Sequence, residues 1–122
     1  MIPIVVSQVE KLTRIGGWLA VVTIIVLSLL PGNERPHTGT PGYIEHIAAY
    51  LITAALLTFG YNARYSLVII AVALSALSGL MEILQLFILG RHAGVDDFAV
   101  SSLGAVVGTA LTWLCLHYIR PA

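Results

Sequence analysis

The sequence predicts an all-α integral membrane protein, a single domain built as a bundle of four membrane-spanning helices. Its 122 residues are 58% hydrophobic and only 10% charged, whereas a soluble domain is about 45–50% apolar and about 25% charged. Four separate apolar segments each approach the roughly 20 residues that cross a bilayer core. Backbone polar groups find no water in lipid, so such segments are expected to be helical.

The first predicted helix covers about residues 15–31 and ends at the breaker pair Pro31-Gly32. Lys11 and Arg14 before an apolar run are also typical of a secretory signal. The run is longer than the usual apolar length of about 7–15 residues, however, and no small-residue cleavage site follows it. We therefore expect an uncleaved membrane anchor, whose N-terminal residues could form a short amphipathic stretch at the membrane surface.

The other three predicted helices cover about residues 43–61, 65–89 and 98–119. The third stops at Gly90-Arg91, and the fourth is closed by Arg120-Pro121. The second and third are joined by so short a turn that they must be antiparallel neighbours.

The basic residues predict the orientation, because cytoplasmic loops carry an excess of Lys and Arg. With four spans the two termini share a side of the membrane. That side carries four basic residues, Lys11, Arg14, Arg64 and Arg120. The other side carries two, Arg35 and Arg91. We expect both termini in the cytoplasm and a multi-pass membrane protein.

The charge balance and the cysteine count exclude other classes. Six basic and six acidic residues give a formal net charge of zero, so the chain lacks the basic face of a nucleic-acid-binding protein. The single cysteine, Cys115, cannot form a disulfide or a zinc cluster of cysteines within the chain. We expect it to pack as a small hydrophobic residue.

Polar side chains recur at helical spacing on three of the four predicted helices, and this spacing places each set on one face. Polar faces in lipid turn toward other helices or a wet cavity, so we expect the three faces to meet. The sets are His46, Tyr50 and Thr53; Ser75, Ser78, Glu82 and Gln85; and Asp97, Ser101, Gly104 and Gly108.

The predicted pocket lies in the outer leaflet, enclosed by the second to fourth helices. Glu82 lies seven residues before Leu89, about 10 Å below the external end of its helix. His46 and Asp97 begin their helices at that same end, so all three could reach one pocket, with Arg91 and His92 capping it.

Each of these residues also has a purely structural interpretation. A charge at mid-helix costs about 2.5–3.5 kcal/mol on insertion scales, so Glu82 could be protonated and hydrogen-bonded to Ser or Gln neighbours. Gln85 could bond across helices, and His46 could be a hydrated helix end. Asp97 could be an N-cap. Arg91 could be a loop charge or the ion-pair partner of the buried acids.

Gly104 and Gly108 form a GxxxG pattern, which predicts close helix packing. The same pair also leaves a homo-oligomer contact open.

Over residues 43–108 the chain resembles the VanZ-like membrane proteins. The blocks resemble that family's H-F-x-A-Y, E-x-x-Q and G-R-x5-D-x6-G-x3-G patterns. They are His46-Ile47-Ala48-Ala49-Tyr50, Glu82-Ile83-Leu84-Gln85, and Gly90-Arg91 followed by Asp97, Gly104 and Gly108.

The chain departs from the family pattern at three positions. Gly42 and Tyr43 stand where the family usually has an Asp-Lys pair, and Ser101 stands where an Asn is usual. Serine keeps a hydrogen-bonding group but has no amide. The resemblance implies a protein of the bacterial cytoplasmic membrane with an envelope role. It also implies a link to tolerance of teicoplanin, a glycopeptide that acts on external cell-wall precursors.

The function we expect is to bind or alter a cell-envelope lipid or a lipid-linked cell-wall precursor. Arg91 and the N-terminus of the fourth helix would suit an anionic headgroup. The expected binding residues are His46, Tyr50, Glu82, Gln85, Arg91, Asp97 and Ser101.

Two alternatives stay open. An enzyme acting on a lipid headgroup could use Glu82, His46 and Asp97 as catalytic residues. The same three could bind a metal, but no local motif such as HExxH occurs, so we expect no metal and no cofactor. A transporter subunit would need an oligomer, and no internal repeat of the transporter kind is visible.

Overall fold

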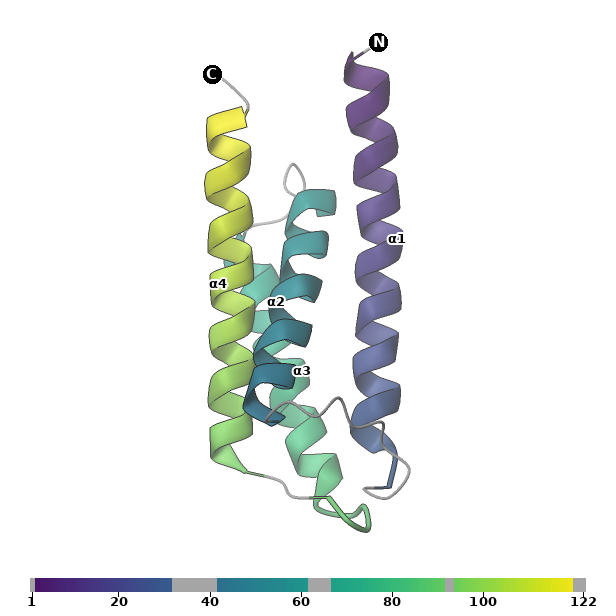
Figure 1. Ribbon diagram of the computed structural model, residues 1–122, viewed down its shortest axis with the longest axis vertical. Helices are drawn as coiled ribbons and strands as arrows, with labels where there is room; N and C mark the ends of the chain where they lie inside the picture. Colours follow the sequence, from purple (N-terminus) through teal and green to yellow (C-terminus); the bar gives the residue numbers. More distant parts are fainter. Residues whose placement is uncertain (1, 32–41, 62–66, 92–93, 120–122) are drawn as a thin grey trace.

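The computed structural model describes residues 2–31, 42–61, 67–91 and 94–119, and four long helices dominate these ranges (Figure 1). They are α1 (Ile2–Leu29), α2 (Gly42–Tyr61), α3 (Leu67–Gln85) and α4 (Val95–Ile119). Each is long and apolar enough to cross a membrane, and no strand occurs in the described ranges. The predicted all-α bundle of four spans is confirmed.

Helix α1 begins much earlier than predicted. It is continuous from Ile2, so the N-terminal residues belong to the same helix as the predicted span, and the expected amphipathic stretch at the membrane surface stays a prediction. Apolar residues such as Val5 and Val9 continue the helical pattern upstream, and Pro3 lies in the first turn, where a missing N–H costs nothing. Lys11 and Arg14 therefore lie within the helix.

Helix α3 ends at Gln85 rather than Leu89, and α4 begins at Val95 rather than Phe98. After α3 the chain continues in a series of tight turns, in which Leu86 N–H donates to Ile83 and Ile88 N–H donates to Gln85. Gly90 has a φ of 76°, a left-handed conformation that favours glycine. Glu82 is consequently one turn from the end of its helix, and it is less deep than predicted.

Helix α2 is the central element and contacts all three others. It runs antiparallel to α3 as predicted, and α1 begins at the same end of the bundle at which α4 ends (Figure 1). The predicted turn at 62–64 lies outside the described residues. The buried core gathers residues of all four helices, which are Val21, Ile24, Tyr50, Ala54, Leu57, Ile70, Leu74 and Ala105.

The two glycines of the GxxxG pattern pack α4 closely onto α2. A Cβ on Gly104 would lie 2.6 Å from the carbonyl oxygen of Ile47, and one on Gly108 would collide with that of Leu51. The chain itself therefore makes the close packing predicted for this pattern. An oligomer contact through the same glycines would have to displace α2.

Much of the outer surface of the bundle is apolar. Large hydrophobic side chains such as Val68 (68% exposed) and Val72 (60% exposed) point outward, which suits contact with lipid and would be unfavourable in water. Cys115 also lies on this surface rather than in the core, contrary to the prediction.

Candidate functional site

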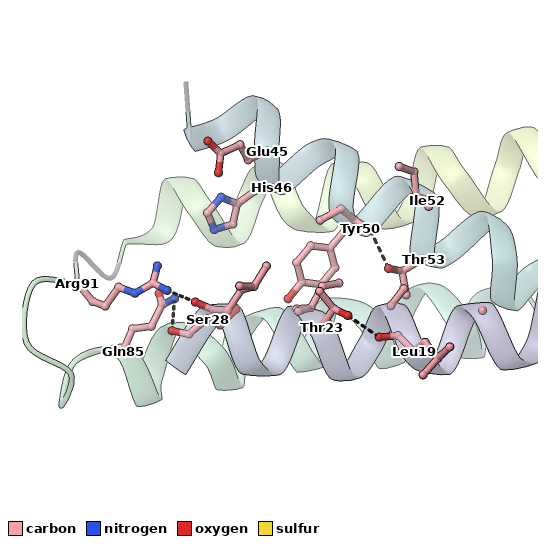
Figure 2. Close-up of a pocket in the computed structure, with 15 residues that line it drawn as sticks. Leu19, Thr23, Ser28, Glu45, His46, Tyr50, Ile52, Thr53, Gln85 and Arg91 are labelled. Carbon is pink, nitrogen blue, oxygen red and sulfur yellow. Dashed lines mark hydrogen bonds between the residues drawn. The ribbon is translucent and has the colours of Figure 1, made fainter. Parts of the chain in front are cut away.

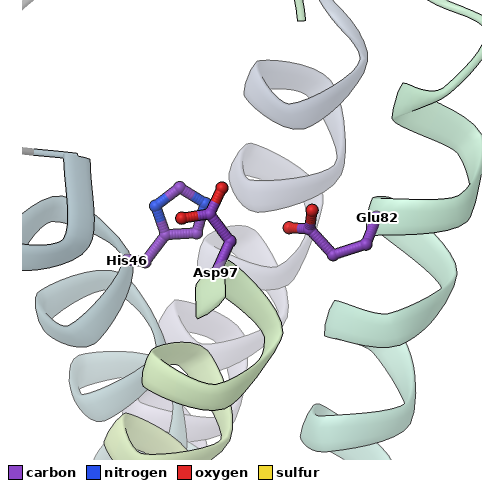
Figure 3. Close-up of side chains that lie close together, drawn as sticks. All are labelled: His46, Glu82 and Asp97. Atoms are coloured by element: carbon purple, nitrogen blue, oxygen red, sulfur yellow. The ribbon is translucent and has the colours of Figure 1, made fainter. Parts of the chain in front are cut away.

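Three side chains from three helices meet at the end of the bundle where α2 and α4 begin. They are His46 on α2, Glu82 on α3 and Asp97 on α4, and one ligand atom of each lies within 4.8 Å of the others. Figure 3 shows the three groups facing a common space. We call these three residues the acid–histidine cluster.

The imidazole of His46 is oriented by a bond to its own helix. Its Nδ1 lies 2.8 Å from the carbonyl oxygen of Gly42, one turn earlier. A carbonyl oxygen can only accept, so Nδ1 carries the hydrogen in this bond. In the neutral ring Nε2 is then left with its lone pair, able to accept a proton or bind a metal.

Glu82 is 9% exposed and supports the start of α4. Its Oε2 accepts the backbone N–H of Gly94 at 2.9 Å, immediately before the helix begins. The first backbone N–H groups of a helix lack partners within it and attract negative charge. This contact differs from the predicted structural interpretation, in which a protonated Glu82 bonds Ser or Gln side chains.

The same arrangement makes the start of α4 acidic. Asp96 and Asp97 lie in its first turn, and both interact electrostatically with Glu82. The N-terminus of α4 is therefore already occupied by carboxylates. This argues against its predicted role as a direct site for an anionic headgroup.

Arg91 and Gln85 bind the C-terminal end of α1. Gln85 Nε2 donates to the carbonyl oxygen of Ser28 at 3.0 Å. Arg91 Nε donates to that of Leu30 at 2.7 Å, and its Nη2 donates to that of Leu27. The last carbonyl groups of a helix lack partners within it, and a cation there is favourable. These bonds hold α1, a role that neither structural interpretation of Arg91, a loop charge or an ion-pair partner of the buried acids, included.

The remaining polar residues of the predicted faces differ in their partners. Tyr50, which is buried, interacts with the Ser78 side chain, and Ser75 lies 2.6 Å from Ser102 across α3 and α4. Ser101 is fully buried, and its hydroxyl has no hydrogen-bond partner among the described residues. It follows Asp97 by one turn on the same face of α4.

A cavity of about 600 Å³ lies between α1 and α2 (Figure 2). Most of its wall is apolar. Glu45, His46, Gln85 and Arg91 lie at one end, whereas Thr23, Tyr50 and Thr53 lie farther along the cavity. Its lining comprises Gly16, Leu19, Ala20, Thr23, Ile24, Leu27, Ser28, Glu45, His46, Ala49, Tyr50, Ile52, Thr53, Gln85 and Arg91.

The cavity differs from the predicted pocket, which was to be enclosed by α2, α3 and α4. Four of the expected binding residues line it, namely His46, Tyr50, Gln85 and Arg91. Three others, Glu82, Asp97 and Ser101, do not line it, and His46 is the member of the acid–histidine cluster that does. The predicted capping residue His92 lies outside the described residues.

The contribution of α1 to the cavity is what sequence reasoning missed. Gly16, Ala20 and Thr23 are small residues at helical spacing, and together they leave room along one face of α1. That spacing was the available signal, although small residues more often mark close packing.

The acid–histidine cluster and the α1–α2 cavity are suited to different chemistry. An imidazole and two carboxylates can transfer protons or bind a metal ion, and a mostly apolar cavity with a few polar groups is typical of a small-molecule site. No family model, no curated protein and no solved structure matches the chain.

Proposed function

We propose that the chain is a VanZ-like protein of the bacterial cytoplasmic membrane that binds an amphiphile of the cell envelope, either a membrane lipid or a lipid-linked cell-wall precursor. The observation that carries this proposal is the polarity gradient of the α1–α2 cavity. Leu19, Ile24 and Ile52 belong to its apolar part, and His46 and Arg91 belong to its polar end. An acyl chain and a polar headgroup have the same gradient.

The length of the cavity suits an acyl chain. Its lining on α1 runs from Gly16 to Ser28, which spans about 18 Å at 1.5 Å per residue. One leaflet contributes about half of a hydrocarbon core about 30 Å thick. A chain lying along α1 would therefore cross one leaflet and leave its headgroup beside Glu45 and His46.

The distribution of basic residues predicts which side of the membrane the polar end of the cavity faces. With both termini in the cytoplasm, the polar end of the cavity lies at the external face, because α1 ends there and α2 begins there (Figure 1). This placement and the VanZ-like resemblance support an external envelope component as the ligand. Altered glycopeptide tolerance would follow if that component were a teicoplanin target.

The test is native mass spectrometry of the protein released from membranes in mild detergent. Ala20→Phe fills the cavity from α1, and Val26→Phe adds the same side chain on the exposed side of α1. We expect a co-purified lipid on the wild type and on Val26→Phe, and at least a fivefold lower lipid-bound fraction on Ala20→Phe. Bare wild-type protein, or equal binding by both variants, would contradict the proposal.

A second candidate is an enzyme that acts on the headgroup of such a lipid. The favouring observation is that His46 belongs to both the cavity and the acid–histidine cluster, so a bound headgroup would lie beside a potential general base. Mass analysis of membrane lipids incubated with the wild type and with His46→Gln tests this. A product formed only by the wild type would support it, and unchanged lipids would remove it.

A further inference from the structure

We propose that the acid–histidine cluster binds a divalent transition-metal ion of the Zn²⁺ type, with His46, Glu82 and Asp97 as its three protein ligands. The ligand atoms lie within 4.8 Å of one another. Zinc bonds of about 2.0–2.2 Å place tetrahedral ligands about 3.4 Å apart. Binding therefore requires the side chains to close by about 1.4 Å at most. This inference depends on no lipid and is independent of the proposed function.

The orientation of His46 is a separate observation in favour of a metal. Metal-binding histidines almost always donate their other ring N–H to a carboxylate, a backbone carbonyl or water, which fixes the ring and the tautomer. His46 makes such a bond through Nδ1 to Gly42. Its Nε2 is then the metal-binding nitrogen, and the ring lies beside the Asp97 carboxylate in Figure 3.

The two negative charges of the cluster also favour a bound metal ion. Glu82 and Asp97 belong to membrane-spanning helices, and their carboxylates repel each other at short range where the dielectric constant is low. A divalent cation between them turns this repulsion into attraction. The bond from Gly94 engages Oε2 of Glu82, and the carboxylate can bind the metal through its other oxygen.

Ser101 fits a site whose fourth position holds water. Three-ligand zinc sites keep one position open for water or substrate. Ser101 lies one turn beyond Asp97, fully buried, with no partner for its hydroxyl among the described residues. Buried polar atoms of this kind are commonly satisfied by ordered water.

The mixed donor set selects the class of metal. Mg²⁺ and Ca²⁺ prefer oxygen ligands alone, whereas imidazole suits Zn²⁺ and its neighbours among the transition metals. We therefore expect Zn²⁺ to bind at least tenfold more tightly than Mg²⁺ or Ca²⁺.

The experiment titrates Zn²⁺ into untagged, metal-stripped protein in detergent, with calorimetry for affinity and elemental analysis for stoichiometry. One Zn²⁺ per chain is expected for the wild type, together with a higher Tm. His46→Gln and Asp97→Asn should each weaken binding at least tenfold. The matched control is His117→Gln, because this residue is exposed and outside the cluster; it should stay within threefold of the wild type.

Several results would overturn this site. They are a wild type that binds no Zn²⁺, cluster variants that bind as tightly as the wild type, or Mg²⁺ binding as tight as Zn²⁺. Circular dichroism of each variant without metal confirms that it is folded. Ala20→Phe should retain Zn²⁺ binding while losing lipid, so failure of the cavity proposal and failure of the metal proposal give different results.

Discussion

Glu82 serves two neighbours at once. One of its oxygens holds the backbone of Gly94 at the start of α4, and its carboxylate also faces His46 and Asp97. A carboxylate in a membrane-spanning helix is costly unless it is paired, so the bond to Gly94 accounts for part of its stability. In the metal proposal, a bound divalent cation balances the second negative charge, which the neighbouring Asp97 carboxylate adds.

Two substitutions separate these contributions in metal-free protein. Glu82→Gln keeps an amide oxygen that can accept the Gly94 N–H and removes the charge, so we expect a change in unfolding free energy of less than about 1 kcal/mol. Glu82→Ala leaves the N–H without its partner and opens a void, which should cost about 2–3 kcal/mol. Denaturant unfolding in micelles measures both, and equal losses would show that the charge, not the bond, stabilises α4.

The end of α1 illustrates how one element depends on a distant one. Gln85 and Arg91 lie 57 and 61 positions along the chain from the carbonyl groups they bind at Ser28 and Leu30. The turns after α3 bring Arg91 back toward α1, and Gly90 makes the last of these turns possible. The polar end of the cavity is therefore shaped by a short segment that has no regular secondary structure.

Gly90→Ala tests this dependence. A φ of 76° costs a non-glycine residue about 1–2 kcal/mol, so the turn should shift and release Arg91 from α1. Hydrogen exchange should then accelerate in residues 24–30 and stay unchanged in residues 8–14. Gly42→Ala is the control, because a Cβ there meets nothing within 4 Å. Unchanged exchange in Gly90→Ala would mean that Arg91 reaches α1 without this turn.

For the whole molecule, the spacing of residues along the chain predicted the four helices and the acid–histidine cluster, but not the α1–α2 cavity. The spacing of His46, Glu82 and Asp97 placed each on an inward face, because helical periodicity is a local property of the chain. The α1–α2 cavity and the end of α3 were not predictable in this way. Both depend on bonds between distant segments, such as that from Gln85 to Ser28, which no local pattern encodes.

The orientation of the bundle decides which leaflet the cavity can serve. The test uses single cysteines in a Cys115→Ser background, which removes the chain's one cysteine. Ser7→Cys lies on α1 near its start, and Val95→Cys lies at the opposite end of the bundle, where the wild-type side chain is 82% exposed. A membrane-impermeant maleimide applied to intact spheroplasts should label Val95→Cys, and should label Ser7→Cys only after the membrane is opened.

The reverse labelling pattern would place Glu45, His46 and Arg91 at the cytoplasmic face. The cavity would then receive a lipid of the inner leaflet, and an external cell-wall precursor would no longer be a possible ligand. The Zn²⁺ proposal would survive this result, because the ligand atoms of His46, Glu82 and Asp97 keep their spacing whichever way the bundle is inserted. Orientation therefore tests the identity of the proposed lipid separately from the chemistry of the cluster.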